Sequence, residues 1–168
     1  MTLPNTRPRT RSACTFTLAL ALLALASLAL ASDGPFASMK GTWAGPGSIT
    51  VNGNKERLRC RATYDVKNSG ATVDLSIRCA SDSYKFDLQG GVNYVNGSVT
   101  GNWSETANGT AGSIAGTVSD GIIKVSATGP HFSALMSVNT RGNTQSVAIT
   151  SPGSQISSVT ISLSKSGS

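Results

Sequence analysis

Four basic residues at a strict spacing of two are the most distinctive chemical feature of the sequence. They are Lys55, Arg57, Arg59 and Arg61, called the basic stripe here. On a β-strand alternate side chains share one face, so the stripe would be ~20 Å long. Ammonium and guanidinium groups bind carboxylates and phosphates through charge-assisted hydrogen bonds. The stripe predicts a surface for an acidic macromolecule or an envelope surface; the alternative is a solvated outer face that discourages edge pairing.

Large apolar side chains form the second group of candidates. They could line an apolar cavity for a small apolar or amphipathic ligand, or they could simply fill a dry core, because aromatic residues are only 5% of the chain. None of them interleaves with the basic stripe, so stacking of nucleic-acid bases is not expected there. The cavity candidates are Trp43, Tyr84, Phe86, Trp103, Phe132 and Met136.

Other chemistry has little support in the sequence. We find no Ser-His-Asp or Cys-His set in a recognisable context, no phosphate-binding glycine loop and no close carboxylate pair. His131 is the only histidine, and a metal site needs several ligands. We therefore predict a non-enzymatic protein without a metal or a cofactor.

The first 31 residues resemble a cleaved signal peptide. Arg7, Arg9 and Arg11 precede an apolar run that ends in the small-x-small pattern of residues 29–31. The run is shorter than the roughly 20 apolar residues of a membrane span. Removal of residues 1–31 leaves 11 of the 14 basic residues and all eight acidic ones, a net charge of about +3. We expect an exported protein, periplasmic or extracellular, with no membrane span after cleavage.

Two cysteines remain after cleavage, and they are expected to pair in an oxidising compartment. Cys60 and Cys79 each lie in a segment of alternating apolar residues. A tight turn at Ser69-Gly70 would set the two cysteines directly opposite each other, and a disulfide would stabilise the fold by ~3 kcal/mol.

That register has an unfavourable consequence, because like charges would face each other across the two strands. It sets Arg61 opposite Arg78 and Asp65 opposite Asp74. A shift of two residues would relieve the repulsion and would keep both cysteines inward. The sequence leaves both registers open.

Alternating apolar residues and frequent turn residues continue through the rest of the chain, and no stretch after residue 31 has helical periodicity. Asn96-Gly97, Asn108-Gly109 and Asp120-Gly121 are typical of type I′ hairpin turns. The second of these turns predicts the pairs Trp103–Ile114, Gly101–Gly116 and Val99–Val118. The third predicts Val118–Ile123, Gly116–Val125 and Ile114–Ala127. Both registers give the same inward face.

These elements indicate an all-β fold of about 9–11 short antiparallel strands connected in sequence order. An up-and-down meander closed, or nearly closed, into a barrel removes exposed strand edges. A two-sheet sandwich is the alternative architecture. We assign residues 1–31 to the signal peptide, 32–40 to a flexible lead-in and 41–168 to one all-β domain.

The start of the first strand resembles that of the calycins, the superfamily that includes lipocalins, fatty-acid-binding proteins and avidins. The resemblance rests on Gly41-Thr42-Trp43, with a second G-x-W at Gly101-Asn102-Trp103. It implies a barrel in which the first Trp packs across the bottom of the core, and no particular ligand. Our leading hypothesis is a barrel that binds a small apolar or amphipathic ligand, and the alternative is an inhibitor-like interaction protein that uses the basic stripe.

Overall fold

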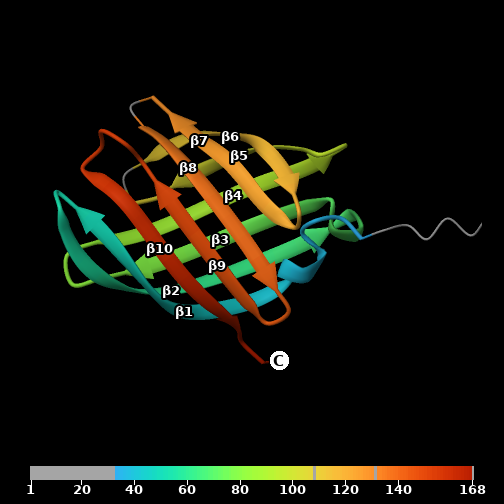
Figure 1. Ribbon diagram of the computed structural model, residues 1–168, viewed down its shortest axis with the longest axis horizontal. Helices are drawn as coiled ribbons and strands as arrows, with labels where there is room; N and C mark the ends of the chain where they lie inside the picture. The colour runs from blue at the N-terminus through green and yellow to red at the C-terminus, as the bar shows by residue number, and fades with distance from the viewer. Residues whose placement is uncertain (1–32, 108, 131, 168) are drawn as a thin grey trace, which may run out of the picture. The chain divides into compact units, whose positions relative to one another are not determined.

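The computed structural model describes residues 33–107, 109–130 and 132–167, except for the side chain of Phe132. Within these residues ten antiparallel strands follow one another in sequence order, and β1 pairs with β10 to close the barrel (Figure 1). The all-β meander and its closure are confirmed, and the sandwich is not formed. The strands are β1 (Gly41–Val51), β2 (Asn54–Lys67), β3 (Thr72–Ala80), β4 (Lys85–Val95), β5 (Ser98–Glu105), β6 (Thr110–Ser119), β7 (Ile122–Gly129), β8 (Phe132–Arg141), β9 (Thr144–Thr150) and β10 (Ile156–Lys165).

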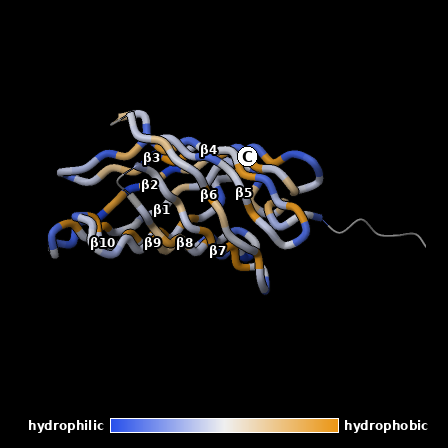
Figure 2. Tube along the Cα trace, turned by 90° about the horizontal axis from the view of Figure 1, so that it is seen from above, coloured by the Kyte–Doolittle hydropathy of each residue, from blue (hydrophilic) through white to orange (hydrophobic). Residues whose placement is uncertain are grey.

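Tight two-residue turns connect several neighbouring strands. Asn96-Gly97 joins β4 to β5 and Asp120-Gly121 joins β6 to β7, with positive φ at all four residues, as a type I′ turn requires. The predicted β6–β7 register is confirmed, including the pair Val118–Ile123. Asn52-Gly53, which the sequence analysis did not use, joins β1 to β2 with the same left-handed backbone. Figure 2 shows hydrophilic residues at turns at both ends of the strands.

The predicted β5–β6 register is wrong by two residues. Trp103 pairs with Gly112, Gly101 with Ile114 and Val99 with Gly116, in place of the pairs predicted from Asn108-Gly109. Asn108 itself lies outside the described residues.

Two contacts account for the shift. The Glu105 carboxylate accepts a hydrogen bond from the backbone N–H of Ala107 at 3.1 Å, and β5 ends at Glu105. Gly112 lies against the Trp103 ring, since a Cβ at Gly112 would lie only 2.8 Å from the indole Nε1. A two-residue shift keeps the same side chains inward, so the predicted face is correct although the partners are not.

The hairpin of β2 and β3 adopts the register that places like charges face to face. Cys60 pairs with Cys79 and forms the expected disulfide. Arg61 consequently faces Arg78, and the two-residue shift is not used.

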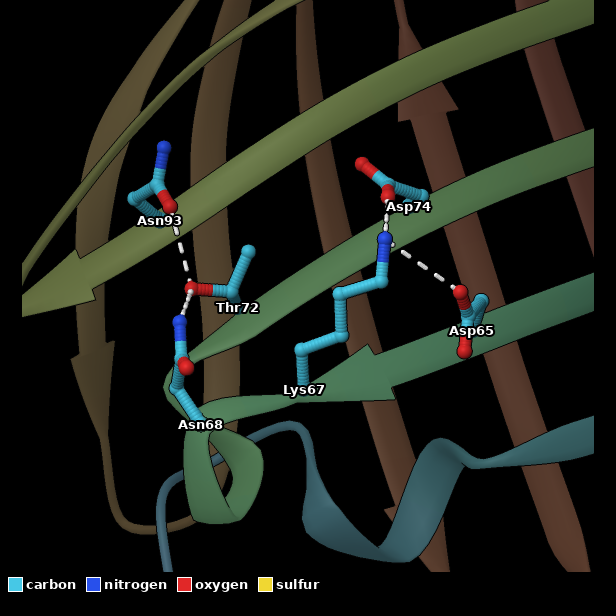
Figure 3. Close-up of polar contacts among 6 residues, drawn as sticks. All are labelled: Asp65, Lys67, Asn68, Thr72, Asp74 and Asn93. Carbon is cyan, nitrogen blue, oxygen red and sulfur yellow. Dashed lines mark hydrogen bonds and ion pairs between the residues drawn. The ribbon is translucent and has the colours of Figure 1, made fainter.

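A third charge compensates each of the two like-charged pairs in this hairpin. Lys67 lies between the facing carboxylates, with its Nζ 2.5 Å from Asp74 and 3.3 Å from Asp65 (Figure 3). Arg78 forms an ion pair with Asp87 on β4. The hydrogen bond from Lys67 to Asp74 also raises the pKa of the lysine.

Residues 32–40 are predicted to be a flexible lead-in, but from Gly34 onward they pack against one end of the barrel. A 3₁₀ turn, η1 (Ala37–Met39), places Phe36 and Met39 in the core. The backbone N–H groups of Gly34 and Phe36 donate to Ser69 and Gly70, in the turn between β2 and β3. This segment therefore covers the end of the barrel where β1 starts, which we call the covered end.

The predicted leader, residues 1–31, lies outside the described residues, so its cleavage stays a prediction. Within the described part of the chain, none of the helices has the length and apolarity that a membrane crossing requires.

Candidate functional site

The basic stripe lies on the outer face of β2. Its four side chains are exposed, whereas Leu58, Cys60 and Ala62, which alternate with them, are at most 3% exposed. The strand alternates in this way because its inward residues are apolar and its outward ones are charged. The four basic side chains therefore share the outer face of the strand, as their spacing predicts.

Neighbouring strands extend the stripe sideways. Arg78 on β3 lies directly opposite Arg61, and Lys85 on β4 and Arg59 on β2 both pair with Ala80 of β3. In the sequence, the Arg61–Arg78 pair counts only against the register. Lys85 cannot be recognised there as part of this surface, because the position of β4 beside β3 follows only from the assembled sheet.

An open depression of about 750 Å³ lies among these cations, and Phe86, one of the apolar candidates, also lines it. Small side chains, Ala44, Ala80 and Ala107, contribute to its lining between the long basic ones. We call the depression the basic groove and define it by Arg59, Arg61, Arg78 and Lys85, which all line it.

One carboxylate, that of Asp87, also lines the basic groove. Its Oδ2 lies 3.0 Å from the Nε of Arg78, and its Oδ1 is buried without a hydrogen-bond partner. The Asp87 backbone is fixed on both sides, because its N–H donates to Glu105 and its carbonyl accepts from the N–H of Thr106. Asp87 is therefore held rigidly beside a guanidinium that is 72% exposed.

The remaining cations of this surface are not neutralised by the part of the chain that the structure describes. Lys55, Arg57, Arg59, Arg61 and Lys85 make no ion pair with any described residue. Glu56 faces away from the stripe, and a hydrogen bond from Ser81 lowers the pKa of its carboxyl. The groove consequently carries an excess of positive charge at neutral pH.

The apolar candidates separate into two groups. Trp43 is fully buried at the covered end, where its indole N–H donates to the Met39 carbonyl at 2.7 Å. The Lys165 Nζ lies 5.5 Å from the centroid of the same ring, close enough for a cation–π contact. Trp43 is thus a structural residue of the closed part of the barrel.

Tyr84, Phe86, Trp103 and Met136 are only partly buried and pack against the core from strands that surround the opposite end. The Trp103 indole N–H donates to the Thr128 carbonyl at 3.3 Å. Phe132 begins β8, and its side chain is outside the described residues.

Side chains fill the interior of the barrel along its length. Ile49 near the end of β1, Leu58 on β2 and Val99 near the start of β5 are at most 1% exposed. Nearer the covered end, the Tyr64 hydroxyl donates to Gln145 Oε1 at 2.7 Å, which bridges β2 and β9. Burial raises the pKa of Tyr64 well above its usual range.

Metal binding finds no support in the described residues, which contain no group of three or more His, Cys, Asp or Glu side chains able to hold a metal ion. His131 lies outside those residues.

Comparison with known proteins relates the chain by its fold alone. No protein-family model matches the sequence, and no curated protein matches it. Among solved structures, the barrel is similar to the crystal structure of Rv2717c from M. tuberculosis, with a TM-score of 0.62 and 12% sequence identity. The similarity covers 77% of this chain and 94% of that one. At this identity the likeness supports the barrel fold and carries no information about the ligand.

Proposed function

We propose that this protein is a non-enzymatic binding protein that holds an acidic partner in the basic groove. The observation that carries the proposal is that four cations from three adjacent strands line one open depression, in which Asp87 is the only carboxylate among the described lining residues. Three of the four cations are arginines, whose planar donor groups suit carboxylate and phosphate oxygens. Asp87 already compensates Arg78, so an anion in the groove would chiefly offset the charges of Arg59, Arg61 and Lys85.

The test is a binding experiment with salt as the variable. We expect heparin, a soluble polyanion, to bind the purified protein and to dissociate steeply as the salt concentration rises. Arg59→Ala and Arg61→Ala should each weaken binding. Lys124→Ala removes an exposed cation from β7, away from the groove, and serves as the matched control. Equal effects of the three substitutions would show attraction by net charge only, and would contradict the proposed site.

A second candidate is the binding of a small apolar or amphipathic ligand at the end of the barrel opposite the covered end. The partial exposure of Tyr84, Phe86, Trp103 and Met136 favours it. Because the middle of the barrel is filled, such a ligand would bind at the mouth. We expect a fluorescent fatty acid to bind with little salt dependence and to bind more weakly after Trp103→Phe, whereas unchanged binding would contradict this candidate.

Export and calycin kinship are parts of the proposal. The Cys60–Cys79 disulfide supports an oxidising compartment, because such bonds rarely persist in the cytoplasm. The ten-stranded barrel and the G-x-W at residues 41–43 support a lipocalin-like ancestry. N-terminal sequencing of the protein from the periplasm or the medium tests export, and an N-terminus at Ser32 is the expected result.

A further inference from the structure

We infer that Asp87 is a positioning residue for Arg78, and that the two together make the basic groove selective for phosphate groups. This inference rests on the proposed function, since it assumes that the groove binds an anion. The Arg78 Nε is already engaged by the Asp87 carboxylate at 3.0 Å. The two terminal Nη groups of Arg78 therefore remain for a ligand, and a guanidinium whose Nε is fixed cannot rotate freely.

The state of Asp87 indicates that its role is more than structural. Its Oδ1 is buried without a partner, and an unpaired buried oxygen destabilises a fold. This unpaired oxygen belongs to the carboxylate of the basic groove, and the negative charge of that carboxylate opposes the binding of an anion. A carboxylate with one buried, unpaired oxygen, placed where its charge opposes anion binding, is explained if it orients the arginine beside it.

The arrangement of the cations favours phosphate over carboxylate. Arg61 lies directly across from Arg78, and Arg59 lies one alternation further along β2 on the same outer face. These donors line the same depression from two strands. A tetrahedral phosphate presents oxygens in several directions and can accept from three guanidiniums at once, whereas a carboxylate has only two oxygens in one plane.

The experiment measures the affinity of the full protein for pyrophosphate and for tricarballylate, a tricarboxylate of similar charge, at one ionic strength. Pyrophosphate is expected to bind more tightly. Asp87→Asn should weaken pyrophosphate binding roughly tenfold, the loss of one charge-assisted hydrogen bond, and should change the NMR signal of the Arg78 Nε–Hε group. Thermal unfolding, measured in parallel, should change little. Arg78→Lys keeps the charge without the fork and should also weaken binding; as an exposed residue it serves if Asp87→Asn does not fold.

The outcomes distinguish a failure of the positioning role or of the phosphate selectivity from a failure of the proposed function. Tighter or unchanged pyrophosphate binding in Asp87→Asn, with weaker binding in Arg61→Ala, would overturn the positioning role and leave the anion groove standing. Equal affinity for tricarballylate would overturn the phosphate selectivity. Anion binding that is insensitive to both Arg59→Ala and Arg61→Ala would overturn the proposed function itself. Vesicles of phosphatidic acid in phosphatidylcholine distinguish a lipid headgroup from a free phosphate compound, because only the former predicts co-sedimentation.

Discussion

Reduction of the Cys60–Cys79 disulfide should lower the stability of the barrel by about 3 kcal/mol. The two cysteines are 19 residues apart in sequence. In the chain-entropy model, a closed loop of that size lowers the conformational entropy of the unfolded chain, which raises its free energy by about 3 kcal/mol. For a domain of this length that corresponds to a fall in the melting temperature on the order of 10 °C. The bond also fixes the register of β2 and β3, so its loss removes that constraint as well.

Urea unfolding with and without a reductant measures this difference in stability in a protein of unchanged sequence. We expect the midpoint to fall on reduction and the dependence on urea to steepen, because the unfolded chain becomes more expanded. A double variant, Cys60→Ala with Cys79→Ala, is the control and should not respond to the reductant. A difference of less than about 1 kcal/mol would refute the reasoning, since it would show that β2 and β3 stay associated in the unfolded chain without the bond.

Two further substitutions test the packing inside the barrel. Gly112→Ala should destabilise the fold by about 3 kcal/mol, because its Cβ would lie 1.8 Å from the Thr128 carbonyl oxygen, whereas Gly167→Ala meets nothing within 4 Å and should be neutral in the same thermal unfolding assay. Tyr64→Phe should cost about 1–3 kcal/mol, because it leaves the buried Gln145 Oε1 without its donor. Since burial raises the pKa of Tyr64, the unfolded chain loses this proton first, so wild-type stability should fall above about pH 10 and should fall less in Tyr64→Phe; equal slopes in urea titrations would contradict the assignment.

Local patterns were sufficient to predict most of the fold. Alternation identified the inward faces, and Asp120-Gly121 fixed a hairpin register because a type I′ turn leaves only one pairing. The register predicted from Asn108-Gly109 is wrong by two residues, because a tertiary contact, the Trp103 ring against Gly112, outweighs the local turn preference. The covering segment at Phe36 was missed because a 3₁₀ turn of three residues has no periodicity to detect.

The candidate site was only partly predictable for a related reason. The basic stripe lies on one strand, and its spacing of two residues was enough to predict that its side chains share one face. Arg78 joins it through the register of a hairpin, and Lys85 and Asp87 join it through the next strand of the sheet. Each added strand requires another correctly predicted register. The charge repulsion between Arg61 and Arg78 counted against the first of these, the register of β2 with β3. The ion pair from Arg78 to Asp87, which removes that objection, becomes visible only when three strands are assembled.

The pairing of β1 with β10 has a consequence for the way in which the protein is made. All other strand pairs join neighbours in the sequence, so each hairpin can form from adjacent strands before the barrel closes. The barrel can close only when residues 156–165 have been synthesised, because Val159 and Ile161 pair with Ile49 and Gly47. Until then β1 and β9 present free edges that invite pairing with other chains. The last strand thus acts as a check on completeness, since a chain that ends early keeps both edges open to aggregation and proteolysis.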